Sequence, residues 1–391
     1  MTRPSPNAGT ALPKIIRIST VPSSLNTFLR GFLRRLSTTY DVLAVSSPGP
    51  ELTEIREREG VRCASVPMER HIAPLKDLVS LFRLIKLFRR ERPTIVHSLT
   101  PKAGLLSMIA ARLTGVPIRI HTFTGLVFPT SHGIKRRLLM FTDSLTCAAA
   151  NYINPEGRGV ARDLTHFGIT RKPLHIIANG NVRGIDLDYY CRDSVADRTR
   201  SLRRDDLFTF CFVGRIVGDK GINELACAFS RLSRENHSVR LWLIGQFEEH
   251  LDPVSPETRQ ILHDNNQISC LGRQSDVRPY LAAADALVFP SYREGFPNVV
   301  LEAGAMGIPA IATDINGCNE IILEGQNGEL IPPRDAEALY LKMKQWSDNP
   351  ARVQAMARNV RRLVAERYEQ QQIWSALLSE YNRLIQDIQK R

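Results

Sequence analysis

The stretch Asp285–Gly307, DALVFPSYREGFPNVVLEAGAMG, contains a buried strand, a loop and a helix start. The apolar run ends at Phe289, the loop Ser291–Phe296 follows, and Pro297 is a residue type favoured at the first helical position. The first N–H groups of a helix lack partners within it, so they can bind an anion such as a phosphate. Here those groups follow Phe296 and belong to Asn298, Val299 and Val300.

Two carboxylates flank this helix start, Glu294 in the loop and Glu302 within the helix, with seven residues between them. An ionised carboxylate offers two acceptor oxygens, which suits the hydroxyl groups of a sugar or the diol of a ribose. Taken singly, either glutamate can equally be a solvated surface residue. Beside the anion site, Glu294 could accept from the hydroxyl groups of a sugar and Glu302 from a ribose diol.

Two cations lie in Phe212–Gly221, FVGRIVGDKG, where a strand ends at Gly214 and a glycine-containing loop precedes the next helix. Arg215 offers a planar fork and Lys220 a point charge, a combination that suits a diphosphate. The alternative is a pair of solvated loop cations. A Walker A loop is absent, and so is a G-x-G-x-x-G after an early strand, which argues against a nicotinamide-dependent dehydrogenase.

Outside these segments, short β-branched runs alternate with amphipathic helical runs, which is typical of βαβ units and parallel sheets. With 391 residues, we expect an α/β protein of two Rossmann-like, doubly wound domains. The expected strands are Ile15–Ser19, Val42–Ser46, Thr94–His97, Ile118–Phe123, Leu174–Ala178, Thr209–Val213, Arg240–Ile244, Ala286–Phe289, Ala310–Ala312 and Glu329–Ile331.

The polar stretch near residues 185–206 predicts the domain boundary. We therefore expect an N-terminal domain over residues 1–190 and a C-terminal domain over residues 191–368. A final helix over residues 369–391 has apolar residues spaced by three or four and is expected to cross back to the N-terminal domain. These apolar residues are Ile373, Leu377, Tyr381, Leu384 and Ile388.

The formal net charge of +12 is unevenly distributed. Residues 1–190 carry 27 Lys and Arg against 13 Asp and Glu, a net of +14, whereas residues 191–391 have a net of −2. This asymmetry indicates that the first domain faces a polyanion or an anionic membrane. Seven scattered cysteines, no evident signal peptide and no long apolar run predict a cytoplasmic protein and restrict any membrane contact to a peripheral one.

The motifs occur in an order that resembles the retaining family 4 glycosyltransferases, whose fold is GT-B. The segments are FVGR…DKG, then LGRQSDVRPYLAAADALVFPSYREGFPNVVLEAGAMGIPAIAT, then NGCNEII, and Glu294 and Glu302 match the E-x7-E motif of that family. In the first half, HSLTPKAGLLSMIAARLTGVPIRIHTFTGL and ANGNVRGID resemble bacterial capsule, O-antigen and lipid-linked glycan transferases.

The resemblance implies a role for each matched position. Arg215 and Lys220 would hold the donor diphosphate and stabilise the leaving nucleotide, and the amides after Phe296 and Pro297, those of Asn298 and Val299 included, would share that task. The remaining matches give Glu294 the donor sugar, Glu302 the ribose, Arg273 the nucleobase border, and Glu320 either a site role or a structural one. No D-x-D motif lies near these residues, so no metal or cofactor is expected.

The first half departs from the wider family at the position of a common histidine. Thr124 precedes Gly125 where many members have His, and His121 lies three residues earlier. A threonine is no general base at neutral pH, so the departure leaves the base of this domain open, and His121 is either a catalytic base or a hydrogen-bonded structural histidine. His97 ends another strand and is a similar case. The leaving phosphate itself can accept the proton of the acceptor in a front-face reaction.

The segment Leu75–Arg92, LKDLVSLFRLIKLFRRER, predicts a basic amphipathic helix. Its apolar side holds Leu75, Leu78, Val79, Phe82, Ile85 and Phe88, and its cations are Lys76, Arg83, Lys86, Arg89 and Arg90. This helix either packs on the sheet with a solvated charged face or lies on anionic lipid. A second cluster, Lys135–Arg137 with Lys102, could also meet the diphosphate of a lipid-linked acceptor.

The resemblance thus implies a retaining glycosyltransferase that moves a sugar from a UDP-sugar to an undecaprenyl-diphosphate-linked glycan in surface polysaccharide assembly, at the anionic cytoplasmic face of the inner membrane. Nucleic-acid binding is a minor rival because no nucleic-acid motif accompanies the basic half. Two further rivals are a GT-B nucleotide-sugar 2-epimerase and a catalytically silent membrane scaffold. The E-x7-E motif argues against the epimerase.

Overall fold

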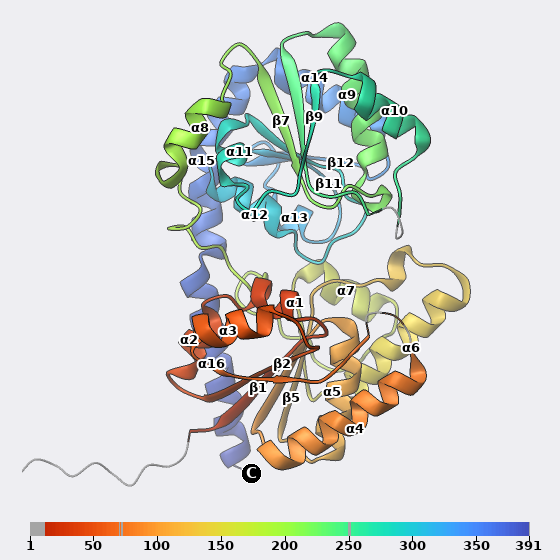
Figure 1. The fold of residues 1–391 in the computed structure, drawn as a ribbon, viewed down its shortest axis with the longest axis vertical. Coiled ribbons are helices and arrows are strands. Elements are labelled where there is room, and N and C mark those ends of the chain that lie inside the picture. The colour runs from red at the N-terminus through yellow and green to blue at the C-terminus, as the bar shows by residue number, and fades with distance from the viewer. Residues whose placement is uncertain (1–11, 70, 72, 249–251, 391) are drawn as a thin grey trace, which may run out of the picture. The chain divides into compact units, whose positions relative to one another are not determined.

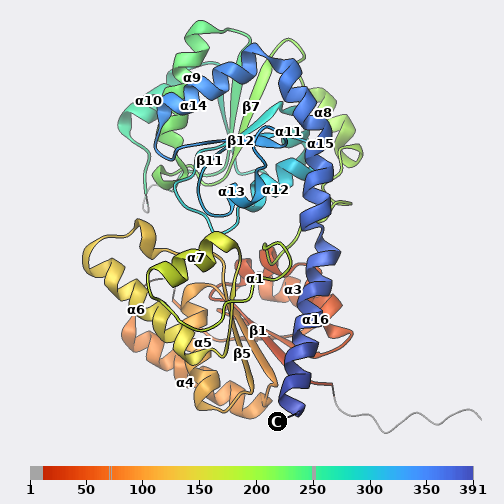
Figure 2. The same cartoon turned by 180° about the vertical axis from the view of Figure 1, so that it is seen from behind.

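The computed structural model describes residues 12–69, 71, 73–248 and 252–390, which form two compact α/β units. The first unit joins the chain up to Glu156 with Ala161–Ile177 and with the chain end from Trp374. The second unit joins Gly157–Val160 with Ala178–Ile373. Each unit is built on a parallel six-stranded sheet with helices on its faces (Figures 1 and 2). The prediction of two doubly wound domains is therefore confirmed.

The sheet of the first unit has the strand order β3-β2-β1-β4-β5-β6. Its strands are β1 (Lys14–Ile18), β2 (Asp41–Ser46), β3 (Arg62–Ser65), β4 (Ile95–Leu99), β5 (Ile118–Phe123) and β6 (Tyr152–Pro155). The helices between them are α1 (Pro22–Phe28), α2 (Phe32–Ser37), α3 (Glu51–Glu59), α4 (Pro74–Glu91), α5 (Pro101–Leu113), α6 (Gly133–Ala149) and α7 (Arg158–His166), with a short 3₁₀ helix at Phe128–Thr130.

The C-terminal helix α16 (Gln370–Gln389) packs on the first unit from Trp374 onward, as its apolar spacing predicts. It shares one face of the first sheet with α1, α2 and α3, and the ring of Trp374 lies 5.6 Å from that of Phe32. A buried polar contact fixes the register, since the Arg17 guanidinium donates to the Tyr381 hydroxyl at 2.6 Å. Helix α5 covers the opposite face of the sheet, between α4 and α6.

The sheet of the second unit has the order β12-β11-β10-β7-β8-β9, so the first strand of each unit lies at the centre, where the chain reverses its direction of winding. The strands are β7 (Phe208–Val213), β8 (Val239–Ile244), β9 (Ile268–Gly272), β10 (Ala286–Phe289), β11 (Ala310–Thr313) and β12 (Gly328–Ile331). The helices are α8 (Ala196–Leu202), α9 (Ile222–Glu235), α10 (Pro256–Asp264), α11 (Arg278–Ala283), α12 (Asn298–Ala305), α13 (Cys318–Ile321), α14 (Ala336–Asp348) and α15 (Pro350–Tyr368), with 3₁₀ turns at Asp193–Val195 and Gly218–Lys220.

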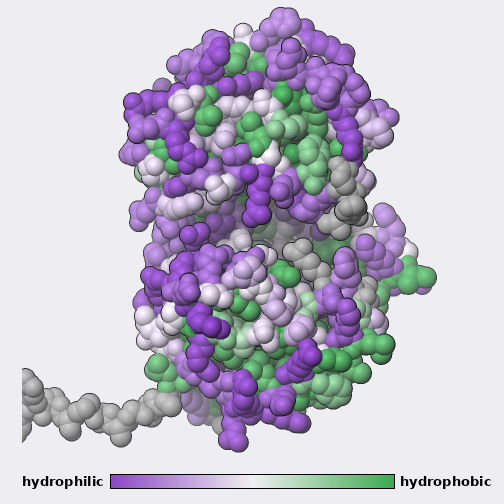
Figure 3. Space-filling view, viewed as in Figure 1, coloured by the Kyte–Doolittle hydropathy of each residue, from purple (hydrophilic) through white to green (hydrophobic). Residues whose placement is uncertain are grey.

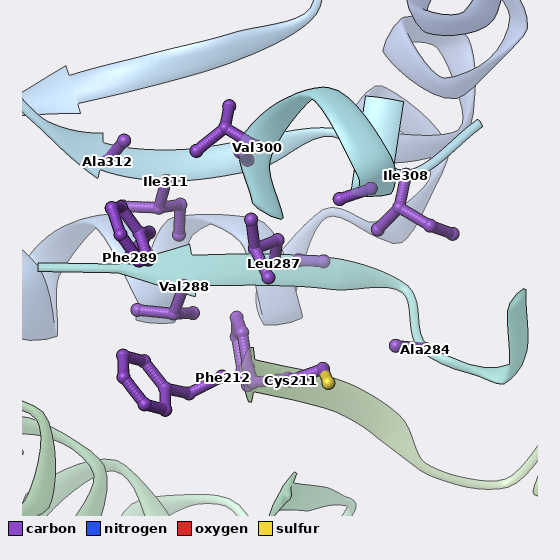
Figure 4. Close-up of a cluster of buried hydrophobic side chains, with 14 of the residues drawn as sticks. Cys211, Phe212, Ala284, Leu287, Val288, Phe289, Val300, Ile308, Ile311 and Ala312 are labelled. Carbon is purple, nitrogen blue, oxygen red and sulfur yellow. The ribbon is translucent and has the colours of Figure 1, made fainter. Parts of the chain in front are cut away.

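The core of the second unit lies against the three central strands β7, β10 and β11. Figure 4 shows their side chains as one apolar cluster, with Val300 contributed by α12. The Phe212 and Phe289 rings stack, with centroids 6.2 Å apart. These side chains are buried, and their packing holds the three strands in place. The loops that follow the strands therefore start from fixed positions.

Nine of the ten expected strands are confirmed in place, most of them within one or two residues. The tenth, Leu174–Ala178, is wrong, because it forms only a single bridge from Leu174 to Ile153, and Ala178 has a positive φ of 50°. Three strands were not expected, namely β3, β6 and β9, and each is the edge of its sheet. An edge strand such as β3, RCAS, has no buried residue, so it lacks the apolar run that marks a central strand.

No helix among the described residues combines the length and the apolar character needed to cross a membrane.

Candidate functional site

Two loops meet at the carboxyl edge of the second sheet, because they follow the adjacent strands β7 and β10. The Tyr292 amide donates to the Asp219 carbonyl at 2.9 Å, and the Arg293 guanidinium donates to the Asp219 carboxylate at 3.0 Å. Gly221 makes this approach possible: its φ is 69°, and a Cβ there would lie 2.1 Å from the Pro290 carbonyl oxygen. The two sequence motifs therefore form one site.

The centre of this site is an ion pair between Lys220 and Glu294, one residue from each loop. The same carboxylate oxygen accepts a hydrogen bond from the Ser291 hydroxyl at 2.9 Å. The Lys220 ammonium also lies 5.7 Å from the centre of the Phe289 ring. Both side chains are largely buried, so a preformed, partly desolvated cation stands beside a carboxylate that can accept from hydroxyl groups.

The start of α12 borders this ion pair. Pro297 is extended and caps the helix with its backbone only, and the first turn holds no acidic residue. The Val300 amide donates to the Pro297 carbonyl at 3.2 Å. It is therefore not a free donor, although the sequence predicted that it would be. Among the described residues, nothing accepts from the amides of Asn298 and Val299. Two unused donors and the positive end of the helix dipole therefore make the anion site.

Glu302 lies one turn into α12 and forms an ion pair with Arg183 at 2.8 Å, a partner that sequence reasoning missed. Burial lowers the pKa of Arg183, but the Glu302 carboxylate and Tyr190 raise it more, so the net shift is upward. Arg183 donates to Oε1 of Glu302, and the Tyr190 hydroxyl also interacts with this carboxylate, so both residues orient it. The segment ANGNVRGID carries part of the family resemblance, but nothing in it indicates that Arg183 reaches α12.

Two residues that the sequence analysis assigned to the site, Arg215 and Arg273, do not contact the ion pair of Lys220 and Glu294 in any bond found among the described residues. The Arg215 guanidinium bonds to Glu248 at 2.9 Å and is 4.0 Å from Asp219, with nearly half of its side chain exposed. Arg273 is exposed and follows β9, which is separated from β7 by β8. Both lie along the carboxyl edge of the same sheet, so their roles toward a diphosphate and a nucleobase stay predictions.

Glu320 has a structural role in the described residues. Its carboxylate accepts from the amides of Arg158 and Gly159, at 2.7 and 2.9 Å, and so caps the first turn of α7. Phe296 is buried and its ring lies 5.5 Å from that of Tyr368, which anchors the loop before α12. These contacts hold the site rather than forming its donor groups.

The two strand histidines of the first unit are buried. His121 is 1% exposed, and its Nδ1 lies 2.8 Å from the Ser98 hydroxyl. A Cβ at Gly104 of α5 would approach the His121 ring to 2.3 Å, so the ring packs directly on that helix. Burial lowers the pKa of His121 to about 3, and the ring is neutral at physiological pH. Its role as a base is untested and stays a prediction.

His97 faces the other side of the sheet and uses both ring nitrogens. Nδ1 bonds to the Tyr381 hydroxyl at 2.6 Å and Nε2 to the Thr122 hydroxyl at 2.7 Å. Burial lowers its pKa well below the usual range. His97 therefore acts as a link between the sheet and α16. Thr124, which occupies the position of the common histidine, is half-buried at the end of β5.

A cavity of about 370 Å³ lies in another part of the second unit. Its lining includes Phe208, Asp285 and Ile308, which stand at or just before the starts of strands. Ligands of parallel α/β sheets bind at the opposite, carboxyl edge, so this cavity is not the candidate site. No group of three or more His, Cys, Asp or Glu with metal-ligand geometry occurs in the part of the chain described.

Comparisons with known proteins identify the family of the chain. A family model described as glycosyl transferases group 1 matches residues 193–363, and one described as a glycosyl transferase 4-like domain matches residues 25–180. The capsular polysaccharide biosynthesis glycosyltransferase CapM of Staphylococcus aureus is 32% identical, over 96% of this chain and 98% of its own length.

Two further proteins extend the comparison. The Escherichia coli UDP-Gal:α-D-GlcNAc-diphosphoundecaprenol α-1,3-galactosyltransferase is 27% identical over 82% of this chain and 84% of its own. Anabaena HepE, solved in complex with UDP and glucose, has a TM-score of 0.79 at 16% identity, and the match covers 95% of this chain and 100% of that one.

Proposed function

Because the chain belongs to the family 4-like glycosyltransferases of GT-B fold, we propose that it transfers a sugar from a UDP-sugar to a lipid-linked glycan, with retention of the anomeric configuration. Its relatives include a transferase named for capsular polysaccharide biosynthesis and two named for diphosphoundecaprenol-linked acceptors, which supports a role in the assembly of surface polysaccharide or lipid-linked glycan. The single observation that carries the proposal is the ion pair between Lys220 and Glu294 beside two unused amides of α12.

The donor diphosphate would lie against Lys220 and the amides of Asn298 and Val299. It would compete with Glu294 for the lysine, which leaves the carboxylate to accept from hydroxyl groups of the donor sugar. Arg215, now paired with Glu248, lies on the same loop and would join the diphosphate. The Glu302 carboxylate would accept from the ribose diol, while Arg183 orients it.

The chemistry needs a stabilised leaving group above all. The bond from C1 of the sugar to the diphosphate breaks through an oxocarbenium-like state, and its electron pair stays on the diphosphate oxygen. A preorganised cation and two amide dipoles stabilise that developing charge without reorganising at the moment of reaction. The acceptor oxygen forms the new bond to C1 on the same face, and its proton passes to the departing phosphate oxygen. No metal takes part in this scheme.

The acceptor is proposed from the relatives. The E. coli relative is named for an undecaprenol-diphosphate acceptor, and so is a Campylobacter jejuni transferase that is 23% identical over 95% of this chain. We therefore assign to this chain a polyprenyl-diphosphate-linked mono- or oligosaccharide, reached from the cytoplasmic leaflet.

The test is a panel of UDP-sugars against undecaprenyl-diphosphate-linked acceptors, read by mass spectrometry, with the linkage read by the NMR coupling of the new anomeric proton. An α-donor that yields an α-linked product supports the proposal, and a β-linked product contradicts retention. Donor incubated without acceptor is the control: its conversion into an epimer would replace the proposal with the epimerase. UDP binding without turnover on any acceptor would favour a silent scaffold.

A further inference from the structure

Helix α4 turns an apolar stripe toward solvent. Leu75, Leu78, Val79 and Phe82 follow the spacing i, i+3, i+4, i+7 that places them on one helix face, and Leu75 and Phe82 are 83% and 63% exposed. The buried side of the helix is a different one, made by Ser80, Leu84, Leu87 and Phe88. Of the six apolar residues that the sequence analysis placed on one side of this helix, only Phe88 is buried.

Helix α6 exposes its apolar face and buries part of its polar face, the opposite of an ordinary surface helix. Ile134, Leu138, Phe141 and Leu145 share one face, spaced i, i+4, i+7, i+11, and that face is exposed, with Ile134 at 85% and Phe141 at 64%. The buried face instead carries Asp143 and Thr146 beside Cys147 and Ala149. A surface helix normally turns its apolar stripe to the core and its polar face to water. The sequence of α6 therefore fits a helix that is covered on its outer side.

These two stripes belong to one surface. Both helices pack on α5, one on each side of it. Eight of the fourteen exposed large hydrophobic side chains in the described part of the chain lie on α4 and α6. In Figure 3 hydrophobic colour gathers at this part of the first unit, near α4 and α6. We call this surface the α4–α6 face, and it is defined by Leu75, Leu78, Val79, Phe82, Ile134, Leu138, Phe141 and Leu145.

The charges beside the α4–α6 face have one sign. Exposed cations lie along α4 and at the start of α6. Among the described residues, no ion pair is found for five of them. These are Arg83, Lys86, Arg89, Lys135 and Arg137. The acidic residues of the two helices are already used or buried. Asp77 binds Lys102, Glu91 binds Lys14 and Arg62, and Asp143 is inside.

We propose that the α4–α6 face docks on an anionic phospholipid membrane, with both helices in the plane of the interface and their apolar side chains inserted at the level of the headgroups. Exposed apolar side chains flanked by cations are the pattern of an interfacial helix. A second copy of the chain fits less well, because identical faces would bring the same cations together. The inference extends the proposed function by placing the lipid acceptor, but its evidence is independent of the donor site.

The test is vesicle flotation of the full chain with phosphatidylcholine alone and with one-third phosphatidylglycerol, at 0.15 and 0.5 M NaCl. We expect binding to the anionic vesicles that is weakened but not abolished at the higher salt, because insertion is apolar and not screened. The double variant Phe82→Ser, Phe141→Ser should lose at least tenfold in partition. Leu341→Ser is the matched control, an equally apolar residue, 54% exposed, on α14 of the second unit, and it should bind as wild type.

Three outcomes overturn the inference. Wild-type chain that ignores anionic vesicles contradicts it directly, and so does a double variant that binds as well as wild type. A dimer in analytical ultracentrifugation that the double variant abolishes, without vesicle binding, would assign the face to a second copy. Circular dichroism and UDP binding verify that the variant is folded. Turnover on a water-soluble short-chain acceptor should be equal in both proteins, so failure of docking and failure of the transferase activity are separate results.

Discussion

The two units have the same strand order and differ in what their sequences place around it. At the carboxyl edge of the second sheet, two loops bring Lys220, Glu294 and the start of α12 together. In the first sheet, His97 and His121 are buried, and the unusual side chains lie on the outer helices α4 and α6 instead. The same strand order thus carries the proposed donor site in the second unit and the proposed docking face in the first, because function depends on the side chains placed on a fold.

The largest expected effect concerns the donor site of the second unit. Lys220→Ala should lower kcat by about 10²- to 10³-fold, since it removes the principal cation facing the leaving diphosphate. Turnover of the UDP-sugar with a soluble acceptor measures the loss. Arg231→Ala is the control, because this arginine of α9 forms an exposed ion pair with Glu337 of α14, away from the loops of the site. If Lys220→Ala turned over at near wild-type rate, the proposed site would be wrong.

Arg183→Met should have a smaller effect on the same unit. It leaves Glu302 without its ion pair, so we expect the dissociation constant for UDP to rise about tenfold, or roughly 1.4 kcal/mol. Calorimetric titration with UDP gives the constant, and thermal unfolding shows whether stability also falls. Arg204→Met, which breaks only an exposed pair with Asp206, provides the comparison. Unchanged UDP affinity would exclude Arg183 as a residue that positions Glu302.

The first unit should respond to acid through its buried histidines. Their pKa is lowered in the folded state, so the unfolded state binds more protons below its own pKa of about 6.5. The stability that depends on a neutral ring is fully present above pH 6.5 and falls as the pH drops below 6.5. For His121 the loss continues to about pH 3, at up to about 1.4 kcal/mol per pH unit, and His97 changes stability in the same direction.

His121→Asn should therefore flatten the fall in unfolding free energy between pH 6.5 and pH 4, as measured by urea titration. His263→Asn, which changes an exposed histidine on α10, should leave the slope as it is. A slope that His121→Asn does not alter would mean that the ring is not held neutral by burial.

The smallest expected effect is none. Excess EDTA should leave turnover unchanged, because Lys220 and the helix amides supply the charge that a metal would otherwise provide. Turnover that EDTA abolishes and Mg²⁺ restores would contradict the metal-independent scheme. It would mean that a metal bound with the donor, rather than Lys220, stabilises the leaving diphosphate.

Much of the second unit could be read from the sequence because its evidence is local. The strand Ala286–Phe289, the loop with Glu294 and the start of α12 are consecutive, and a buried apolar run followed by Pro297 predicts all three. The unexpected strands are edges, such as β9, ISCLG, where only one residue is buried. Burial is weak in β3 and β9, and the buried strand β6, YINP, is only four residues long and ends in Asn154 and Pro155, so the sequence alone does not separate these strands from loops.

The sequence by itself determined the two α/β domains and the uneven charge, because each depends on residue type, spacing or simple counting, and the resemblance to a family placed FVGRIVGDKG and the E-x7-E segment in one donor site. Only the tertiary structure decided which partner each charged group takes. Arg183 reaches Glu302 over 119 positions, and His121 is enclosed by α5. The outward direction of the apolar faces of α4 and α6 was decided in the same way. A helical spacing fixes which side chains share a face, but only the packing of the other helices fixes where that face points.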